Sequence, residues 1–334
     1  MQYAFLGRSG MRVSRLCLGT MNFGPRVEEK DAHALMDRAL ELGINFFDTA
    51  DAYGPTHLNP ALYNGYCEEI IGRWFALGGN RREHTVLTTK CGMKMPSNTT
   101  DGPNDELGYS AYRIRKHVDA SLSRLQTDHI DVHMMHHIDY RTGWDEVWET
   151  YGALIAQGKV TYAASSNFGA RHLCWAQQAA EERGMYGLVA EEHKYHLLCR
   201  EPELEVLPAC QEMGIGVVTY HPLWEGMWSG HMLETTSGGQ RGYAMRQKIK
   251  PEHLEKLERY AKLCDEIGES MPTVTYAWLL SNPAVTSIII GPRTMEQLES
   301  SVRATEITLD DEVLAKIDEI YPGMGGSAPK AYAW

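Results

Sequence analysis

The chain has 334 residues and a formal net charge of −12 at pH 7. This length suits one large domain, because single domains of the larger α/β kind take about 250 residues or more. The negative charge argues against a surface for nucleic acid or an anionic membrane, since both require clustered lysine and arginine. We therefore expect a soluble protein that binds neither.

The seven cysteines are scattered along the chain, and no two form a Cys-x-x-Cys pair. This pattern suits reduced thiols in the cytosol better than a disulfide framework or a zinc site. The N-terminus has no basic segment followed by an apolar stretch, and no apolar run approaches the roughly 18 residues that span a membrane. The expected location is cytoplasmic.

Two short apolar segments, 3–6 and 11–15, flank the turn 7–10 and predict a β-hairpin. After this hairpin, short apolar runs alternate with amphipathic stretches. The runs predict strands at 16–20, 45–49, 85–91, 130–136, 160–166, 188–193, 214–220 and 287–290. The stretches predict helices at 28–42, 68–77, 111–125, 143–157, 170–183, 203–212, 252–268 and 295–302. Eight strand–helix pairs predict a parallel sheet that closes into a barrel.

Two further helical segments, 273–280 and 310–320, add to the eight pairs, and 323–334 is expected to form a tail. No linker divides the chain. The predicted fold class is therefore α/β, a single (β/α)8 barrel over 1–334 with an N-terminal hairpin and extra C-terminal helices.

The longest stretches without periodicity are 54–66, 92–108 and 224–250, and each follows a predicted strand. In a parallel barrel these loops lie on the face that carries the catalytic residues.

Four polar residues stand at or just after the C-terminal ends of predicted strands: Asp48, Tyr53, Lys90 and His136. Each alone has an ordinary explanation as a cap, as packing or as a lysine that reaches solvent. Together they suggest acid–base chemistry, because an ammonium beside a phenol favours phenolate and a carboxylate keeps a buried lysine charged. An imidazole beside them can hold a substrate oxygen.

In this chain order the four residues resemble the catalytic tetrad of the aldo-keto reductase superfamily. The resemblance covers nearly the whole chain, starting with residues 6–10 and 18–24, and its specific signals are 47–54 and 131–136. It is greatest to bacterial members similar to potassium-channel β subunits and to sugar ketoreductases. It implies reduction of an aldehyde or ketone by hydride from NADPH, with Tyr53 as general acid, Lys90 and Asp48 tuning it, and His136 orienting the carbonyl. Relatives that reduce a conjugated carbon–carbon bond have glutamate in place of this histidine, which favours carbonyl reduction here.

No Gly-x-Gly-x-x-Gly follows a predicted strand, and Gly214-Ile215-Gly216 precedes one. The segment 287–297 offers the other device of a barrel, a loop that leads into a helix N-terminus. Gly291 would let a phosphate group approach the backbone closely, and the Arg293 guanidinium could donate two hydrogen bonds to it. Arg293 could also be a solvent-exposed residue at the start of a helix. The resemblance implies Arg293 on the 2′-phosphate and Gln297 near the adenine, and hence NADPH over NADH. Four residues after Gln297, Ser301 replaces the asparagine that is usual in the family.

For the nicotinamide end, the resemblance implies carboxamide contacts from Ser166 and Asn167, stacking by Tyr220, and a further contact from Leu223. Glu192 stands where glutamine is usual. An ionised Glu192 would favour the oxidised, cationic ring. The alternative is a protonated or solvated carboxyl group. His221 replaces the usual serine.

Two other groupings are less specific. His133, His136 and His137 do not converge on a straight strand, so we expect no metal site. Trp224 and Trp228 either form an aromatic wall for substrate or pack the loop, because both roles use the same side chains.

The expected partner is a small-molecule carbonyl, and a sugar or sugar nucleotide is the finer candidate. Acidic residues on the loops could bind hydroxyl groups: Asp101, Asp105 and Glu106. Local cations for a nucleotide would be Arg26, Lys94 and Arg141. The alternative function is an NADPH-binding regulatory subunit resembling potassium-channel β subunits, and either function is compatible with a homo-oligomer.

Overall fold

The structure is a computed structural model that describes residues 1–54, 64–93, 104, 108–230, 232–233 and 249–325. Eight parallel strands close a barrel in the order β10-β3-β4-β5-β6-β7-β8-β9. They are β3 (Leu16–Gly19), β4 (Phe46–Asp48), β5 (Val86–Cys91), β6 (Ile130–Met135), β7 (Val160–Ser166), β8 (Leu188–Lys194), β9 (Gly216–Tyr220) and β10 (Val285–Ile290). The predicted (β/α)8 fold is confirmed.

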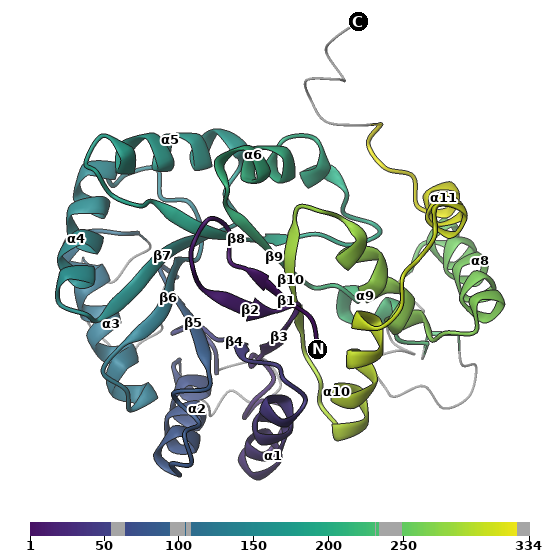
Figure 1. Ribbon diagram of the computed structural model, residues 1–334, viewed down its shortest axis with the longest axis horizontal. Helices are drawn as coiled ribbons and strands as arrows, with labels where there is room; N and C mark the ends of the chain where they lie inside the picture. The colour runs from purple at the N-terminus through teal and green to yellow at the C-terminus, as the bar shows by residue number, and fades with distance from the viewer. Residues whose placement is uncertain (55–63, 94–103, 105–107, 231, 234–248, 326–334) are drawn as a thin grey trace, which may run out of the picture.

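Helices surround the barrel, as Figure 1 shows. They are α1 (Glu29–Glu41), α2 (Tyr66–Ala76), α3 (Ala111–Leu125), α4 (Trp144–Ala156), α5 (Ala170–Glu181), α6 (Val206–Met213), α8 (Pro251–Ile267), α9 (Met271–Ser281), α10 (Met295–Val302) and α11 (Asp311–Ile320). Short 3₁₀ turns occur at η2 (Glu201–Glu203), η3 (Trp224–Ser229) and η4 (Arg303–Thr305). No helix in the described ranges is both long and apolar enough to cross a membrane.

The structure exchanges the roles that the sequence suggested for two C-terminal helices. We expected 252–268 to complete the seventh pair and 273–280 to be an addition. Instead α9 packs on β10, whereas α8 packs on α9 and α11 at the outside of the ring (Figure 1). Most of α9 is buried, so it lacks the one-sided pattern that marks a barrel helix, while α8 shows that pattern because only one face is covered.

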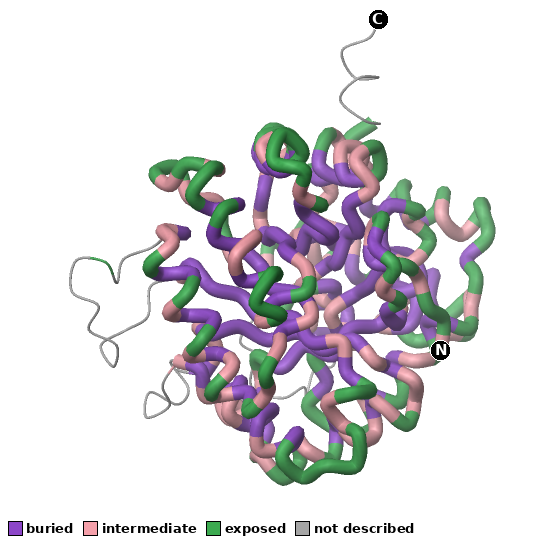
Figure 2. Tube along the Cα trace, turned by 60° about the vertical axis from the view of Figure 1, so that its left-hand side comes forward, coloured by how far each residue is buried: buried purple, intermediate pink, exposed green. Residues whose placement is uncertain are grey.

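The core has two layers. One lies between the strands and the helices, and the other fills the barrel interior, so buried residues run through the centre of the molecule in Figure 2. The interior layer includes Cys17, Phe46, Val132, Met134, Ala164 and Val218. These side chains alternate along their strands with others that face the helices, as expected for a packed barrel.

The predicted hairpin is confirmed as β1 (Tyr3–Phe5) and β2 (Arg12–Ser14), and it lies across one end of the barrel (Figure 1). Leu6 and Val13 join the interior layer from this end. The Arg8 amide donates to the carbonyl of Gly214, which lies just before β9, over 2.7 Å. Gly7 has a φ of +57°, and a side chain there would collide with the Val189 carbonyl, so the close approach requires glycine. The hairpin therefore covers the N-terminal ends of the strands.

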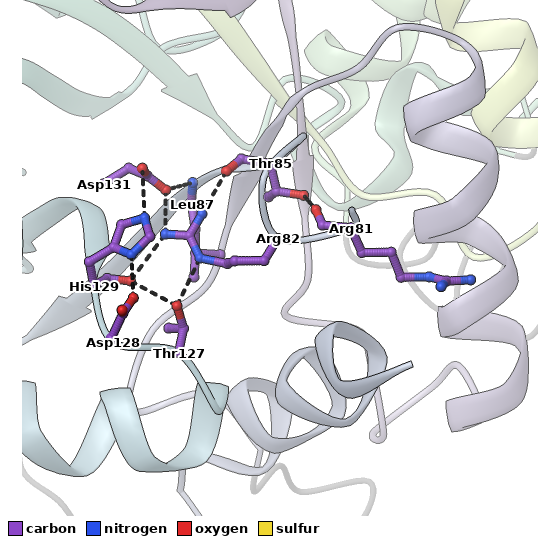
Figure 3. A network of polar contacts seen from close by, with 8 residues as sticks. All are labelled: Arg81, Arg82, Thr85, Leu87, Thr127, Asp128, His129 and Asp131. Carbon is purple, nitrogen blue, oxygen red and sulfur yellow. Dashed lines mark hydrogen bonds and ion pairs between the residues drawn. The ribbon is translucent and has the colours of Figure 1, made fainter. Parts of the chain in front are cut away.

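A polar network, drawn in Figure 3, secures β5 and β6 near the starts of these strands. Asp131 accepts from the Leu87 amide over 2.8 Å and pairs with Arg82 at 2.9 Å. Arg82 also donates to the carbonyls of Thr85 and His129. Because these contacts satisfy backbone groups at strand starts, they stabilise the barrel away from the face where the strands end.

Two helical glycines allow a test of this packing. Gly72 of α2 faces α3, where an added Cβ would collide with the Arg124 carbonyl, whereas the nearest atom to a Cβ at Gly152 of α4 is Met185 Cε at 3.7 Å. We expect Gly72→Ala to lower the free energy of unfolding by about 1–3 kcal/mol, because the helices must separate. Gly152→Ala should raise it by up to about 1 kcal/mol through helix propensity. Urea unfolding measures both, and equal effects would contradict this description of the α2–α3 contact.

Candidate active site

The ends of three neighbouring strands bring the four predicted catalytic residues together. Asp48 is the last residue of β4, Lys90 lies one residue before the end of β5, and His136 follows β6 directly. Tyr53 lies in the turn after β4, where its amide donates to the Ala50 carbonyl. The four side chains therefore meet at the C-terminal end of the barrel, opposite the hairpin.

Lys90 is at the centre of this group, and its side chain is completely buried. Its Nζ donates to Asp48 Oδ1 over 2.5 Å, to the Thr49 carbonyl over 3.0 Å and to the Tyr53 hydroxyl over 3.4 Å. Burial favours the neutral amine, but Asp48 and Glu192 outweigh it and raise the pKa of Lys90 well above its ordinary value. Lys90 is therefore a fixed positive charge beside the phenol.

The balance of effects on Tyr53 differs from the sequence expectation. Burial raises the pKa of the phenol, Lys90 lowers it, and Asp48 and Glu192 raise it again, so that the net change is upward. The ammonium acts in the expected direction but does not dominate, because the site is buried and holds two carboxyl groups. Tyr53 consequently keeps its proton at neutral pH.

His136 is neutral in this setting. Burial, with Lys90 and His137 as further causes, lowers the pKa of its imidazole to about 2. Its ring meets the Tyr53 ring edge-on, with centroids 6.0 Å apart. A neutral imidazole donates one N–H, so His136 can hold an uncharged acceptor such as a carbonyl oxygen next to the phenol.

The residues expected near a nicotinamide are linked to this group. Asn167, at a φ of +61°, donates from its amide to the His136 carbonyl (3.0 Å) and to Ser166 Oγ (2.9 Å). The Tyr220 hydroxyl donates to Asn167 Oδ1 over 2.6 Å. The ends of β7 and β9 are thus joined to the residue that follows β6.

Glu192 of β8 lies on the same side as Lys90, opposite Ser166 in the strand register. Its Oε2 is 3.1 Å from Lys90 Nζ, and its side chain is 5% exposed, so the solvated alternative does not apply. Burial and Asp48 raise the pKa of Glu192 to about 8, with Lys90 opposing. This direction favours the protonated alternative at neutral pH.

The expected phosphate site lies in the turn between β10 and α10. Arg293 and Gly291 are exposed, and no hydrogen bond or ion pair joins the Arg293 guanidinium to any described residue. The Arg293 amide donates to Gln297 Oε1 over 2.8 Å, and Thr294 caps α10. A free guanidinium at a helix N-terminus is a donor set that fits a phosphate group. Ser301 donates to the Gln297 carbonyl within α10, so its hydroxyl is already engaged.

The aromatic wall is not supported for Trp228. This residue is fully buried, and its indole N–H donates to the Tyr321 hydroxyl over 3.0 Å, so it packs the loop onto the end of α11. Trp224 is half-buried and stacks on His196 with centroids 5.9 Å apart. Both contacts correspond to loop packing, the other role considered for these side chains. Leu223, next to Trp224, packs against the core.

The three histidines do not form one group. His133 is buried, and its Nδ1 lies 2.8 Å from the Tyr151 hydroxyl of α4, whereas His136 and His137 stack on each other. Among the described residues no cluster of three or more histidine, cysteine or acidic side chains could hold a metal ion.

Some expected substrate contacts fall on residues outside the described ranges. These are Lys94, Asp101, Asp105 and Glu106.

Sequence reasoning missed one buried pair behind the turn that carries Tyr53. His117 Nδ1 lies 2.6 Å from Asp51 Oδ2, and both residues are buried. The position of Asp51 between Asp48 and Tyr53 was the available signal, because an acidic residue in a short turn after a buried strand needs a partner.

An acid–base group on the C-terminal face of a closed parallel barrel is the arrangement of a barrel enzyme. The family model described as Aldo/keto reductase family matches residues 15–322, and the chain belongs to this family. The chain is 51% identical over 334 residues to "Uncharacterized oxidoreductase YrpG" of Bacillus subtilis (strain 168), which covers 100% of both chains. The family and this relative support an oxidoreductase.

Two other relatives have different printed names. The chain is 30% identical to the "Probable voltage-gated potassium channel subunit beta" of Arabidopsis thaliana, over 96% of each chain. It is 28% identical to the "Versiconal hemiacetal acetate reductase" of Aspergillus parasiticus, over 96% of this chain and 97% of the relative. Similar sequences of this length therefore include both a reductase and a channel subunit.

The contact between Lys90 and Asp48 should be measurable in stability. Lys90→Met leaves two buried carboxyl groups without their cation, and we expect it to lower the free energy of unfolding by about 3–5 kcal/mol. The double variant Lys90→Met/Asp48→Asn should lose less, because one of the two carboxyl groups is then removed. Urea unfolding of both variants and of Asp48→Asn gives the double-mutant cycle for Lys90 and Asp48. Additive losses would show that the pair is not coupled.

Proposed function

We propose that this protein reduces an aldehyde or ketone to the alcohol with NADPH, and that Tyr53 is the general acid. The observation that carries the proposal is the convergence of a protonated phenol, a buried ammonium 3.4 Å from it and a neutral imidazole. Membership of the aldo/keto reductase family supports the same reaction class.

The roles follow from the contacts of each side chain. The neutral His136 donates a hydrogen bond to the carbonyl oxygen and orients it toward Tyr53. Tyr53 gives its hydroxyl proton to that oxygen, and Lys90 stabilises the phenolate that remains. Asp48 keeps Lys90 charged and in place over 2.5 Å. The reduced nicotinamide, when bound, supplies the hydride to the carbonyl carbon.

The residues that would hold NADPH lie at two ends of the same face. Ser166, Asn167 and Glu192 would hold the carboxamide, and Tyr220 would stack on the ring. At the other end Arg293 would bind the 2′-phosphate, which favours NADPH over NADH. Leu223, Gly291 and Gln297 complete the proposed set.

The substrate is proposed at the level of a small carbonyl compound, with a sugar or sugar-nucleotide carbonyl as the finer candidate. The resemblance to sugar ketoreductases and the acidic residues of the 92–108 loop support this candidate. Trp228 does not support it, because this residue is buried, and the contact described for Trp224 is stacking on His196.

A second candidate function is a regulatory subunit that binds NADPH and assembles with a membrane channel. The 30% identity to proteins named as potassium-channel β subunits favours it. The two candidates share a cofactor site and differ in turnover. Tight NADPH binding without reduction of any carbonyl would therefore favour the subunit, while rapid reduction would favour the enzyme.

Tyr53→Phe tests the role of the phenol. We expect NADPH oxidation with aldehydes and ketones to fall by at least about 100-fold, because the proton donor is lost, while NADPH still binds. Absorbance follows turnover, and quenching of tryptophan fluorescence follows binding. The matched control is Tyr162→Phe on β7, since the Tyr162 hydroxyl forms no hydrogen bond with the described residues. Retained turnover in Tyr53→Phe would refute the assignment.

Arg293→Ala tests the phosphate contact. Loss of a charged hydrogen bond of about 1.5–3 kcal/mol should weaken NADPH binding by about 10–100-fold and leave NADH binding nearly unchanged. The control is Arg303→Ala at the far end of the same helix, where the guanidinium pairs with Glu269. Dissociation constants for both cofactors give the result. An unchanged ratio of the two in Arg293→Ala would remove Arg293 from the site.

A further inference from the structure

Two carboxyl groups share one ammonium in the buried site. Lys90 Nζ lies 2.5 Å from Asp48 Oδ1 and 3.1 Å from Glu192 Oε2, and all three side chains are at most 5% exposed. Thr88 donates a further hydrogen bond to Asp48 Oδ1 over 2.6 Å. Glu192 is thus in direct contact with the catalytic ammonium, in addition to its proposed contact with the carboxamide.

The charges of this group do not balance if both carboxyl groups are ionised. One ammonium and two carboxylates give a net charge of −1 in a site from which water is excluded, and burial of such a charge is costly. Ionisable groups from the neighbouring elements also face Glu192. They are Asp48 of β4, Lys90 of β5, Cys17 of β3, Tyr53 after β4 and Tyr220 of β9. Lys90 is the only cation among these groups, so one proton held by Glu192 makes the site neutral.

We propose that Glu192 holds one proton, the shared proton of the group formed with Lys90 and Asp48, and that loss of this proton to solvent weakens Tyr53 as an acid. The shared proton is inferred from the three side chains alone, while its effect on turnover rests on the proposed function. Glu192 acts through Lys90 and Tyr53, so it is a positioning residue for proton donation.

The consequence for Tyr53 follows from the sign of the charges. A second carboxylate beside Lys90 offsets the ammonium and makes phenolate less favourable, so Tyr53 donates its proton less readily. The pKa of Glu192 is raised to about 8, which places the change just above neutral pH. Reduction should therefore slow as the pH rises through about 8.

The first experiment compares kcat/KM for carbonyl reduction from pH 6 to pH 10. In the wild type we expect a fall of about tenfold by about pH 9, and in Glu192→Gln we expect the fall to be absent or displaced to higher pH. The control is Glu191→Gln, since Glu191 on the same strand faces away from the site and contacts Ser165 and the Phe168 amide. It should keep the wild-type profile. An unchanged fall in Glu192→Gln would overturn the proposal.

The second experiment does not depend on turnover. The Glu192 pKa is raised on folding from about 4.3 to about 8, so the folded state retains a proton that the unfolded chain loses, and the wild type loses stability as the pH rises through this window. Glu192→Gln lacks this loss. The unfolding midpoint of Glu192→Gln, relative to that of the wild type, should therefore rise between pH 6 and pH 9. A constant difference would overturn the shared proton.

The two experiments separate the proposals. If the difference in midpoint widens but no carbonyl is reduced, the shared proton stands and the proposed function fails. If Glu192→Gln does not fold, infrared titration of Glu191→Gln, which retains Glu192, still gives a result. A protonated carboxyl band that disappears near pH 8 supports the shared proton, and a carboxylate throughout that range overturns it.

Discussion

The structure of this site depends on one buried positive charge. Lys90 has no contact with solvent, and a lone ammonium in such a place would lose its proton. Asp48, at 2.5 Å, prevents this and also fixes where the ammonium points. Lys90 also donates to the Tyr53 hydroxyl, and it adds to the effect of burial in keeping His136 neutral. Burial and Asp48 raise the pKa of Glu192 although Lys90 opposes them.

The barrel makes this arrangement possible because the contacts that stabilise it and the side chains of the site lie at opposite ends of its strands. The hairpin and the network around Asp131 and Arg82 secure the N-terminal ends of the strands. The opposite ends are then free to present side chains from β4, β5, β7, β8 and β9, and from the residue that follows β6, at short distances from one another. The hydrogen bonds from Asn167 to the His136 carbonyl and to Ser166 join the ends of β6 and β7 within the site.

The alternation of apolar runs and amphipathic stretches was sufficient to predict the fold, because each strand of a packed barrel is buried and each covering helix usually has one apolar face. The same pattern gave the wrong role for α9. This helix is buried on most sides, so its sequence lacks the one apolar face of a barrel helix, and we expected it to be an addition to the eight pairs. The proximity of Asp48, Tyr53, Lys90 and His136 could be predicted because strand ends converge. The raised pKa of Tyr53 could not, because it depends on burial and on Glu192, a residue distant in the sequence. The packing of Trp228 against Tyr321 was also inaccessible, since the two lie far apart along the chain.

The most direct test of the central claim follows the hydride itself. Wild-type protein is mixed with NADPH that carries deuterium on the transferred position of the nicotinamide, together with a panel of aldehydes, ketones and keto-sugars. Mass spectrometry of the products then locates the label. The account predicts deuterium on the carbinol carbon of the product alcohol. If NADPH binds and no product carries the label, the claim that this site reduces carbonyl groups is contradicted.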